Sequence, residues 1–143
     1  MSSNSGADAE LTLVICKPDA VERGLVGDII ARLERRGLRL VRAELRLLDK
    51  ETAAVHYQEH QGKPFYQGLI EYITRSPVLV MAVGGPADTW QVVRRTIGAT
   101  NPANADPGTI RGDLALVTTE NLVHGSDGAE SARREVGVFF ADL

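Results

Sequence analysis

The amino-acid sequence predicts an α+β fold in which four strands form one antiparallel sheet. Short runs of β-forming residues alternate with segments whose apolar residues recur at helical spacing. Gly, Pro and Asp residues mark the ends of several of these runs, as they do at turns. The chain of 143 residues is 43% hydrophobic and 24% charged, which is typical of one globular domain with a single core.

The first half of the chain is expected to form two strands with a helix between them. Residues 11–16 are a compact apolar run that ends at residues 17–19 (KPD), which predicts a strand and then a loop. Apolar residues recur at helical spacing over residues 26–33, which predicts a helix. Residues 38–48 alternate as a strand does, but the alternation slips near Val41, and this slip indicates a β-bulge.

The second half is expected to form, in order, two short helices, a buried strand, a helix, a last strand and a last helix. Their ranges are 50–60, 64–73, 77–83, 87–97, 113–118 and 127–139. Without the helix pair and the last helix, the order is β-α-β-β-α-β, which is the ferredoxin-like plan. We therefore expect a disordered N-terminal extension over residues 1–9 and one such domain over residues 10–143.

Charge and composition restrict the partners and the compartment. The net charge of −3 argues against a general nucleic-acid binder, because such domains carry a basic surface. Cys16 is the only cysteine, so no intrachain disulfide can form, which fits a reducing compartment. The first ten residues do not resemble a signal peptide, and no segment has the length of a membrane helix. We expect a cytoplasmic protein with no membrane partner.

One long segment has neither helical nor strand periodicity. Residues 98–112 contain two prolines and several Asn and Asp residues, which favour a fixed path. Structureless segments longer than about 12–15 residues are uncommon in compact domains and are usually functional or disordered. A functional loop and an ordinary surface loop are equally compatible with its length.

His124 is the strongest candidate for a reactive residue. Asp127 and Glu130 resemble a capping box, which predicts a helix that starts at Asp127, just after His124. The field at a helix N-terminus favours a neutral, nucleophilic imidazole and an incoming phosphate. Glu135, on the same helix, could hold one ring nitrogen of His124 and leave the other free. The alternatives are a surface or core histidine and a solvated glutamate.

Three basic residues come from separate parts of the chain. If Lys17, Arg94 and Arg111 converge, they can neutralise a polyphosphate and its transition state. The alternative is a solvated surface. The sequence contains neither a P-loop nor a protein-kinase signature, so a phosphate enzyme here must use another architecture.

Histidines and aromatic residues cluster between residues 56 and 65. His56 and His60 have the i, i+4 spacing of a helical zinc motif, but Tyr57 stands where that motif has Glu, so we interpret both as non-metal residues. Tyr57 and Phe65 are candidates for lining a pocket, because a flat ring stacks on any base. Core packing is the alternative for both.

Six segments resemble, in order, motifs of the nucleoside diphosphate kinases. They are LVICKPD (13–19), HYQEH (56–60), GKPFY (62–66), GATNP (98–102), PGTIRGD (107–113) and NLVHGSD (121–127). The resemblance runs from about residue 10 to residue 140 and implies a ferredoxin-like fold. It also implies a ping-pong reaction in which a nucleoside triphosphate phosphorylates His124 and a nucleoside diphosphate then accepts the phosphate.

The resemblance assigns roles to the residues around His124. Glu135 would orient His124, and Ser126 would support it. Lys17 and Asn121 would contact the ribose hydroxyls and the phosphates near the leaving oxygen, and Phe65 would stack on the base. The residues expected to bind phosphate oxygens are Tyr57, Arg94, Thr100 and Arg111. Mg²⁺ would arrive on the phosphates of ATP or other nucleotides, not in a protein cage.

The chain departs from the family pattern at a few positions. Ala20 and Gly128 replace the usual Gly and Ser, and residues 83–86 (VGGP) replace a stretch of Trp and Gly with an apparent one-residue insertion. None of these changes removes a proposed catalytic group. The chain ends at Leu143, short of the tail of eukaryotic-type members, so a homo-oligomer is expected but either a tetramer or a hexamer fits.

Two other functions are compatible with the same fold. A ferredoxin-like domain that binds nucleotides or nucleic acid without turnover would keep Phe65 and the basic residues but would not need His124. A purely structural interaction domain would leave Thr100 and Arg111 unexplained. The intact motif at residues 124–127 favours the phosphotransferase.

Overall fold

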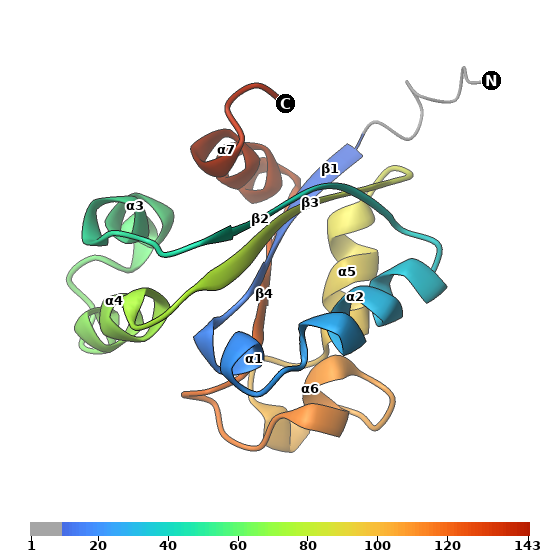
Figure 1. Ribbon diagram of the computed structural model, residues 1–143, viewed down its shortest axis with the longest axis horizontal. Coiled ribbons are helices and arrows are strands. Elements are labelled where there is room, and N and C mark those ends of the chain that lie inside the picture. Colours follow the sequence, from blue (N-terminus) through green and yellow to red (C-terminus); the bar gives the residue numbers. More distant parts are fainter. Residues whose placement is uncertain (1–9) are drawn as a thin grey trace.

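The computed structural model describes residues 10–143, and the predicted N-terminal extension lies outside them. Its centre is a four-stranded antiparallel sheet with the strand order β2-β3-β1-β4 (Figure 1). The strands are β1 (Glu10–Cys16), β2 (Arg39–Arg46), β3 (Val78–Gly85) and β4 (Val123–Gly125). The predicted ferredoxin-like arrangement is confirmed. No helix within this described range is long and apolar enough to cross a membrane.

Helices cover both faces of the sheet (Figure 1). One face carries α2 (Val26–Arg35) and α5 (Thr89–Ile97), and the other carries α3 (Lys50–His56), α4 (Tyr66–Thr74) and α7 (Ala129–Phe139). Because side chains alternate along a strand, β1 contributes to both cores. Leu13 and Ile15 pack under α4 and α7, whereas Val14 and Cys16 pack under α2 and α5. This burial on both faces fixes the position of β1, and Lys17 follows directly after its last residue.

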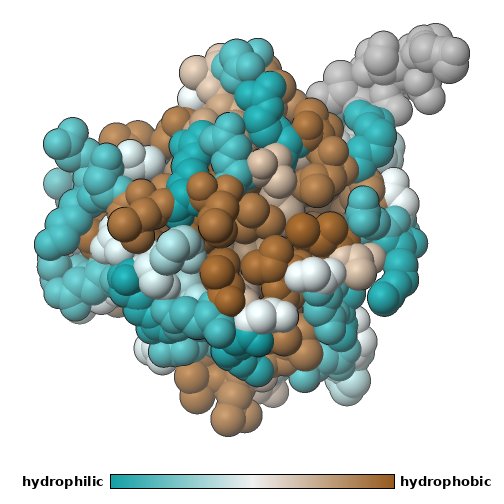
Figure 2. Space-filling model, in the orientation of Figure 1, coloured by the Kyte–Doolittle hydropathy of each residue, from teal (hydrophilic) through white to brown (hydrophobic). Residues whose placement is uncertain are grey.

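The edge strand β2 contains the predicted bulge. Its pairing with β3 shifts between Leu40 and Arg42, so Val41 is the extra residue. Several large apolar side chains on or next to β2 remain exposed, namely Leu40, Val41, Leu45 and Leu47. Figure 2 shows apolar side chains gathered at the centre of the face over which β2 runs.

The predicted last strand over residues 113–118 is wrong. Thr109 caps a helical turn, α6 (Ile110–Leu114), by accepting a hydrogen bond from the Gly112 amide at 3.0 Å. After it, Val117 and Glu120 form only an isolated bridge. The fourth strand is β4, which pairs three residues with β1 and carries His124 itself. A strand of three residues is too short to show alternation in a sequence.

The predicted start of the last helix at Asp127 is also wrong. Helix α7 begins at Ala129 with Gly128 as its N-cap and no side-chain cap. The Asp127 carboxylate accepts a hydrogen bond from the Ser131 side chain, which lowers the pKa of Asp127. His124 therefore lies on a strand, and the helix-terminus argument does not account for its position.

Three short helical segments occur where loops or longer helices were expected. Helix α1 (Pro18–Glu22) follows β1, and its proline occupies the first turn, where a missing N–H costs nothing. The first helix of the pair ends at His56 and continues as η2 (Gln58–His60). The long aperiodic segment contains η3 (Pro102–Asn104) and leads into α6, so it follows a fixed path.

Candidate active site

A cavity of about 860 Å³ lies where β1, β4, the helix pair and the 98–122 segment meet. Ten residues were predicted to form the site, and nine of them line this cavity. The nine are Lys17, Tyr57, Phe65, Arg94, Thr100, Arg111, Asn121, His124 and Glu135. The tenth, Ser126, is fully buried and contacts Glu135. Scattered loop residues thus converge on a pocket of the size that small ligands occupy.

His124 is held by a buried glutamate on α7. Its Nε2 lies 2.8 Å from Oε1 of Glu135, a residue that is 3% exposed. Ser126 donates to the same Oε1 at 2.7 Å and accepts from the Leu13 amide at 3.3 Å. Burial raises the pKa of Glu135, but the hydrogen bonds from His124 and Ser126 outweigh it and hold this pKa below its usual value. The glutamate is therefore a carboxylate that can only accept hydrogen bonds.

This geometry determines which nitrogen of His124 is nucleophilic. Because the carboxylate of Glu135 can only accept, Nε2 of His124 must carry the proton and donate it. The lone pair of the neutral ring then lies on Nδ1. Within residues 10–143, no hydrogen bond to a protein group occupies Nδ1. The site therefore presents one free imidazole nitrogen at the cavity wall.

His56 is a site residue whose role the sequence did not indicate. It is 2% exposed, and its ring centroid lies 4.7 Å from that of His124 in an edge-on arrangement. Neither ring nitrogen has a hydrogen-bond partner in the described part of the chain. Burial, then the nearby His124, lowers the pKa of His56 to about 3, so it packs against His124 as a neutral ring. The i, i+3 spacing from the buried Ala53 is the signal that could have indicated this inward position.

The two histidines of the helix pair have different surroundings. Nδ1 of His60 contacts Nζ of Lys63 at 3.2 Å, away from His56. His56, His124 and Glu135 instead offer three potential metal-ligand atoms within 4.8 Å of one another. Oε1 of Glu135 is already shared by His124 and Ser126, so this cluster serves to hold the imidazole.

Lys17 projects from the end of β1 into the cavity. Its Nζ donates to Oδ1 of Asn121 at 2.8 Å, and Nδ2 of Asn121 donates to the carbonyl of Thr100 at 3.1 Å. Burial, then the positive charge of Arg111, lowers the pKa of Lys17 to about 7, although Asp19 opposes this shift. An anion in the cavity would restore the charged form of the ammonium.

Arg111 is a buried cation, 4% exposed. Its guanidinium donates to three backbone carbonyls, those of Gly98, Asn121 and Val123, at 3.3, 3.1 and 2.5 Å. Burial, then the positive charge of the neighbouring Arg94, lowers its pKa to about 10. Across residues 10–143, no carboxylate forms an ion pair with Arg94, Arg111 or Lys17. Their charge remains available to a polyphosphate.

Asp19 connects α1 to the segment that precedes His124. Its side chain is 1% exposed, it accepts a short hydrogen bond from the Tyr72 hydroxyl, and its other oxygen accepts from the Leu122 amide at 3.1 Å. Nζ of Lys17 lies 5.5 Å from the centre of the Tyr72 ring. The KPD turn at residues 17–19 could have indicated Asp19, but nothing in the sequence indicated Tyr72.

The entrance of the cavity is aromatic. Phe65 is 52% exposed at the rim, beside the ring of His60 at 5.5 Å. Tyr57 is buried, and its hydroxyl has no hydrogen-bond partner among residues 10–143. Burial raises the pKa of Tyr57, so this hydroxyl stays protonated and can donate to a ligand. The arrangement suits a molecule with a flat ring outside and anionic groups inside.

Comparison with known proteins identifies the family. The family model described as nucleoside diphosphate kinase matches residues 10–143. The chain belongs to the nucleoside diphosphate kinase family. It is therefore a transferase that moves the terminal phosphate between nucleotides, and the predicted fold, enzyme class and family are confirmed.

Relatives named nucleoside diphosphate kinase match over most of their length. The protein of Thermomicrobium roseum is 54% identical over 133 residues, which are 93% of this chain and 89% of the relative. That of Pyrococcus abyssi is 54% identical over 138 residues, which are 94% of this chain and 86% of the relative. Among solved structures, the Halobacterium salinarum nucleoside diphosphate kinase in complex with CDP has a TM-score of 0.89 and 47% identity. The match covers 94% of this chain and 89% of the Halobacterium salinarum chain.

The departures from the family pattern lie away from the reactive groups. Gly84 and Gly85 complete β3, and a Cβ at Gly85 would lie 2.6 Å from Oγ1 of Thr89 at the start of α5. The glycine thus permits this turn from strand to helix. Ala20 is fully buried in α1, and Gly128 is the N-cap of α7. None of the four lines the cavity.

Proposed function

We propose that this chain transfers phosphate by a ping-pong reaction through Nδ1 of His124. The observation that carries the proposal is the hydrogen bond between Nε2 and Glu135, which leaves Nδ1 as the nucleophile at the wall of a basic cavity. The Nδ1 lone pair attacks the terminal phosphorus of a nucleoside triphosphate, and an N–P bond forms. The bond to the bridging oxygen breaks, its electron pair leaves with the diphosphate, and a terminal oxygen of a second diphosphate later reverses the step.

The residues around the cavity divide the work by position. Lys17 and Asn121, joined by their 2.8 Å hydrogen bond, bind the ribose hydroxyls and the phosphates near the leaving oxygen. Phe65 stacks on the base at the rim, and such stacking does not distinguish bases. The residues that bind phosphate oxygens are Tyr57, Arg94, Thr100 and Arg111, and the charges of the two arginines stabilise the transition state.

The cofactor is Mg²⁺ carried by the nucleotide phosphates. Besides Glu135, which holds His124, the carboxylates that line the cavity are Glu59 and Asp127. Two carboxylates are too few for a protein cage around Mg²⁺, which keeps several waters and prefers substrate phosphates. The donor set thus suits a metal that enters with its nucleotide and neutralises phosphate charge.

We further propose that residues 10–143 act as one domain of a cytoplasmic homo-oligomer that maintains the nucleoside triphosphate pool. The exposed apolar side chains along β2 support assembly, because Leu45 and Leu47 are 65% and 67% exposed beside one another. Contiguous apolar surface of this kind typically marks an interface between proteins. Both a tetramer and a hexamer are compatible with this surface.

The test is incubation of the protein with labelled ATP and Mg²⁺ alone. We expect the chain to become labelled on a phosphohistidine that is labile to acid and stable to base, and to lose the label to added GDP. His124→Asn should abolish both labelling and transfer. His60→Asn, at the rim of the same cavity, is the matched control and should still be labelled. Continued exchange of phosphate by His124→Asn would refute the proposed mechanism.

A further inference from the structure

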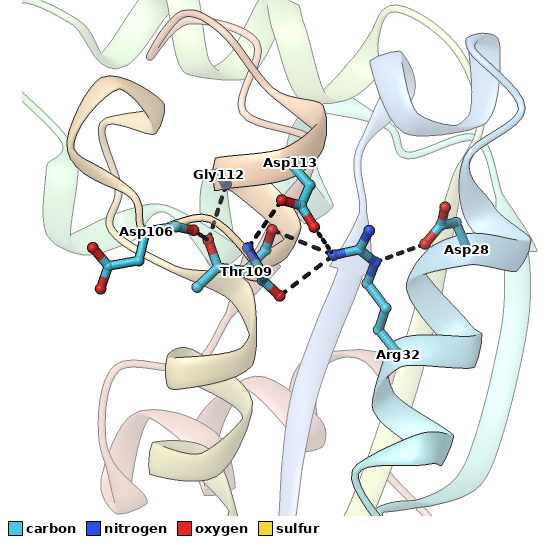
Figure 3. Close-up of polar contacts among 7 residues, drawn as sticks. Asp28, Arg32, Asp106, Thr109, Gly112 and Asp113 are labelled. Carbon is cyan, nitrogen blue, oxygen red and sulfur yellow. Dashed lines mark hydrogen bonds and ion pairs between the residues drawn. The ribbon is translucent and has the colours of Figure 1, made fainter.

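Arg32, on α2, lies outside the cavity but is the centre of a polar cluster behind it (Figure 3). Its Nε lies 2.7 Å from a carboxylate oxygen of Asp28, one turn earlier on the same helix. Its NH1 lies 2.7 Å from a carboxylate oxygen of Asp113, on α6. The same NH1 is within 3.4–3.5 Å of the carbonyls of Gly108 and Thr109. One guanidinium thus binds its own helix and the turn that starts α6.

The turn held by Arg32 is tightly constrained. Oδ1 of Asp113 accepts from the Gly108 amide at 2.9 Å, while its Oδ2 pairs with Arg32. Oγ1 of Thr109 donates to the Asp106 carbonyl at 2.6 Å and accepts from the Gly112 amide. A Cβ at Gly112 would lie 1.9 Å from the Asp106 carbonyl oxygen, so the turn has no space for a side chain at this position.

Arg111 lies within this turn, on the side that faces the cavity. It is a buried cation whose contacts are backbone carbonyls, and such contacts compensate its burial less well than a carboxylate would. The burial that lowers its pKa also favours movement of the guanidinium toward water. The position of Arg111 therefore depends on how firmly its turn is attached to the rest of the molecule.

We propose that Arg32 is a positioning residue for phosphate transfer, which holds Arg111 in the cavity wall by fixing the 106–113 turn to α2. The proposal rests on the proposed role of Arg111 in binding phosphate. Asp28 and Asp113 divide the contacts of Arg32 into two parts. The ion pair with Asp28 is internal to α2, whereas the ion pair with Asp113 reaches the turn, where NH1 also makes its longer contacts with the carbonyls of Gly108 and Thr109. Removal of the two carboxylates should therefore have unequal effects on catalysis.

The test is the second-order rate constant for phosphorylation of His124 by ATP and Mg²⁺, measured in single turnovers. We expect Arg32→Gln to lower it on the order of 10-fold, because a displacement of about 1 Å at a reacting site can cost up to about 100-fold. Asp113→Asn keeps an oxygen for the Gly108 amide but loses the ion pair, and should give a similar loss. Asp28→Asn is the matched control and should stay within about 2-fold of the wild type.

A double variant separates positioning from a general loss of structure. In an Arg111→Gln background, we expect Arg32→Gln to change the rate constant by less than about 2-fold. Arg32 acts only through the position of the Arg111 guanidinium, which this background lacks. Arg32→Lys should recover part of the rate, since one ammonium can pair with Asp113. Equal losses from Asp28→Asn and Asp113→Asn, or an undiminished effect of Arg32→Gln in the Arg111→Gln background, would overturn the proposal. If the wild-type chain itself is not labelled, the proposed function fails instead.

Discussion

The two walls of the cavity are built in different ways. The wall that carries His124 consists of regular structure, because β4 pairs with the buried strand β1 and Glu135 comes from α7. The other wall, with Thr100 and Arg111, belongs to the 98–122 segment and is held by hydrogen bonds from side chains to backbone carbonyls. The first wall holds the reacting nitrogen, and the second surrounds the phosphate. We expect changes in the two walls to affect different kinetic quantities.

The largest effect is expected at the wall built from regular structure. Glu135→Ala removes the acceptor of both His124 and Ser126, so Nε2 is no longer required to carry the proton. We expect the maximal phosphorylation rate to fall on the order of 100-fold, with little change in the half-saturating ATP concentration. The two unpaired donors should also lower the free energy of unfolding by about 1–3 kcal/mol. Single-turnover kinetics and denaturant unfolding measure the two quantities.

Another glutamate of α7 provides the control for this experiment. Glu130 is exposed on the same helix, so Glu130→Ala should leave the phosphorylation rate and the unfolding free energy nearly unchanged. If Glu135→Ala raised the half-saturating ATP concentration and kept the maximal rate, Glu135 would bind the nucleotide instead of orienting the imidazole.

A smaller effect is expected from the segment that forms the second wall. In Gly112→Ala, the new Cβ would lie 1.9 Å from the Asp106 carbonyl oxygen, so the turn that carries Arg111 must shift. We expect kcat/KM for ATP to fall on the order of 10-fold, with a clear rise in the half-saturating concentration. Gly27→Ala, in α2, is the control, because its Cβ meets no atom within 4 Å. If Gly112→Ala lowered only the maximal rate and left the half-saturating ATP concentration unchanged, the second wall would not be the part of the site that binds the phosphates.

The same contrast explains how much the sequence could predict. The apolar run of residues 11–16 predicted β1 correctly, because a strand buried on both faces is apolar throughout. The slip in alternation near Val41 predicted the bulge correctly, because side chains alternate along a strand. The last strand was placed wrongly, since β4 has only three residues and its pairing partner is more than 100 residues away. The residue pattern within a short segment does not indicate which distant strand the segment pairs with.

The sequence predicted the residues that line the cavity more fully than the residues that hold them in place. Ordered motifs indicated Lys17, Arg111 and His124, although they come from distant parts of the chain, and the cavity brings them together. The inward position of His56 and the attachment of Arg32 to the 106–113 turn depend on how helices pack on the sheet. The i, i+3 spacing from Ala53 gives only the inward face of His56, and because packing sets the contacts themselves, neither charge nor spacing in the sequence could predict them.

The smallest effect at neutral pH is expected at Lys17, which links the two walls through its bond to Asn121. Burial, then Arg111, lowers the pKa of Lys17 to about 7 in the free protein, and a bound phosphate should raise it again. Above pH 7, nucleotide binding must therefore take up a proton at Lys17, and the Kd for ADP should rise with pH, by at most about 10-fold per pH unit.

In Lys17→Arg the guanidinium stays charged, so this rise should disappear. Lys63→Arg, at the rim, should keep the wild-type slope when Kd is measured by calorimetry between pH 7.5 and 9. An equal slope in the wild type and Lys17→Arg would mean that the ammonium is already charged in the empty cavity, and that Asp19 outweighs the burial imposed by the two walls.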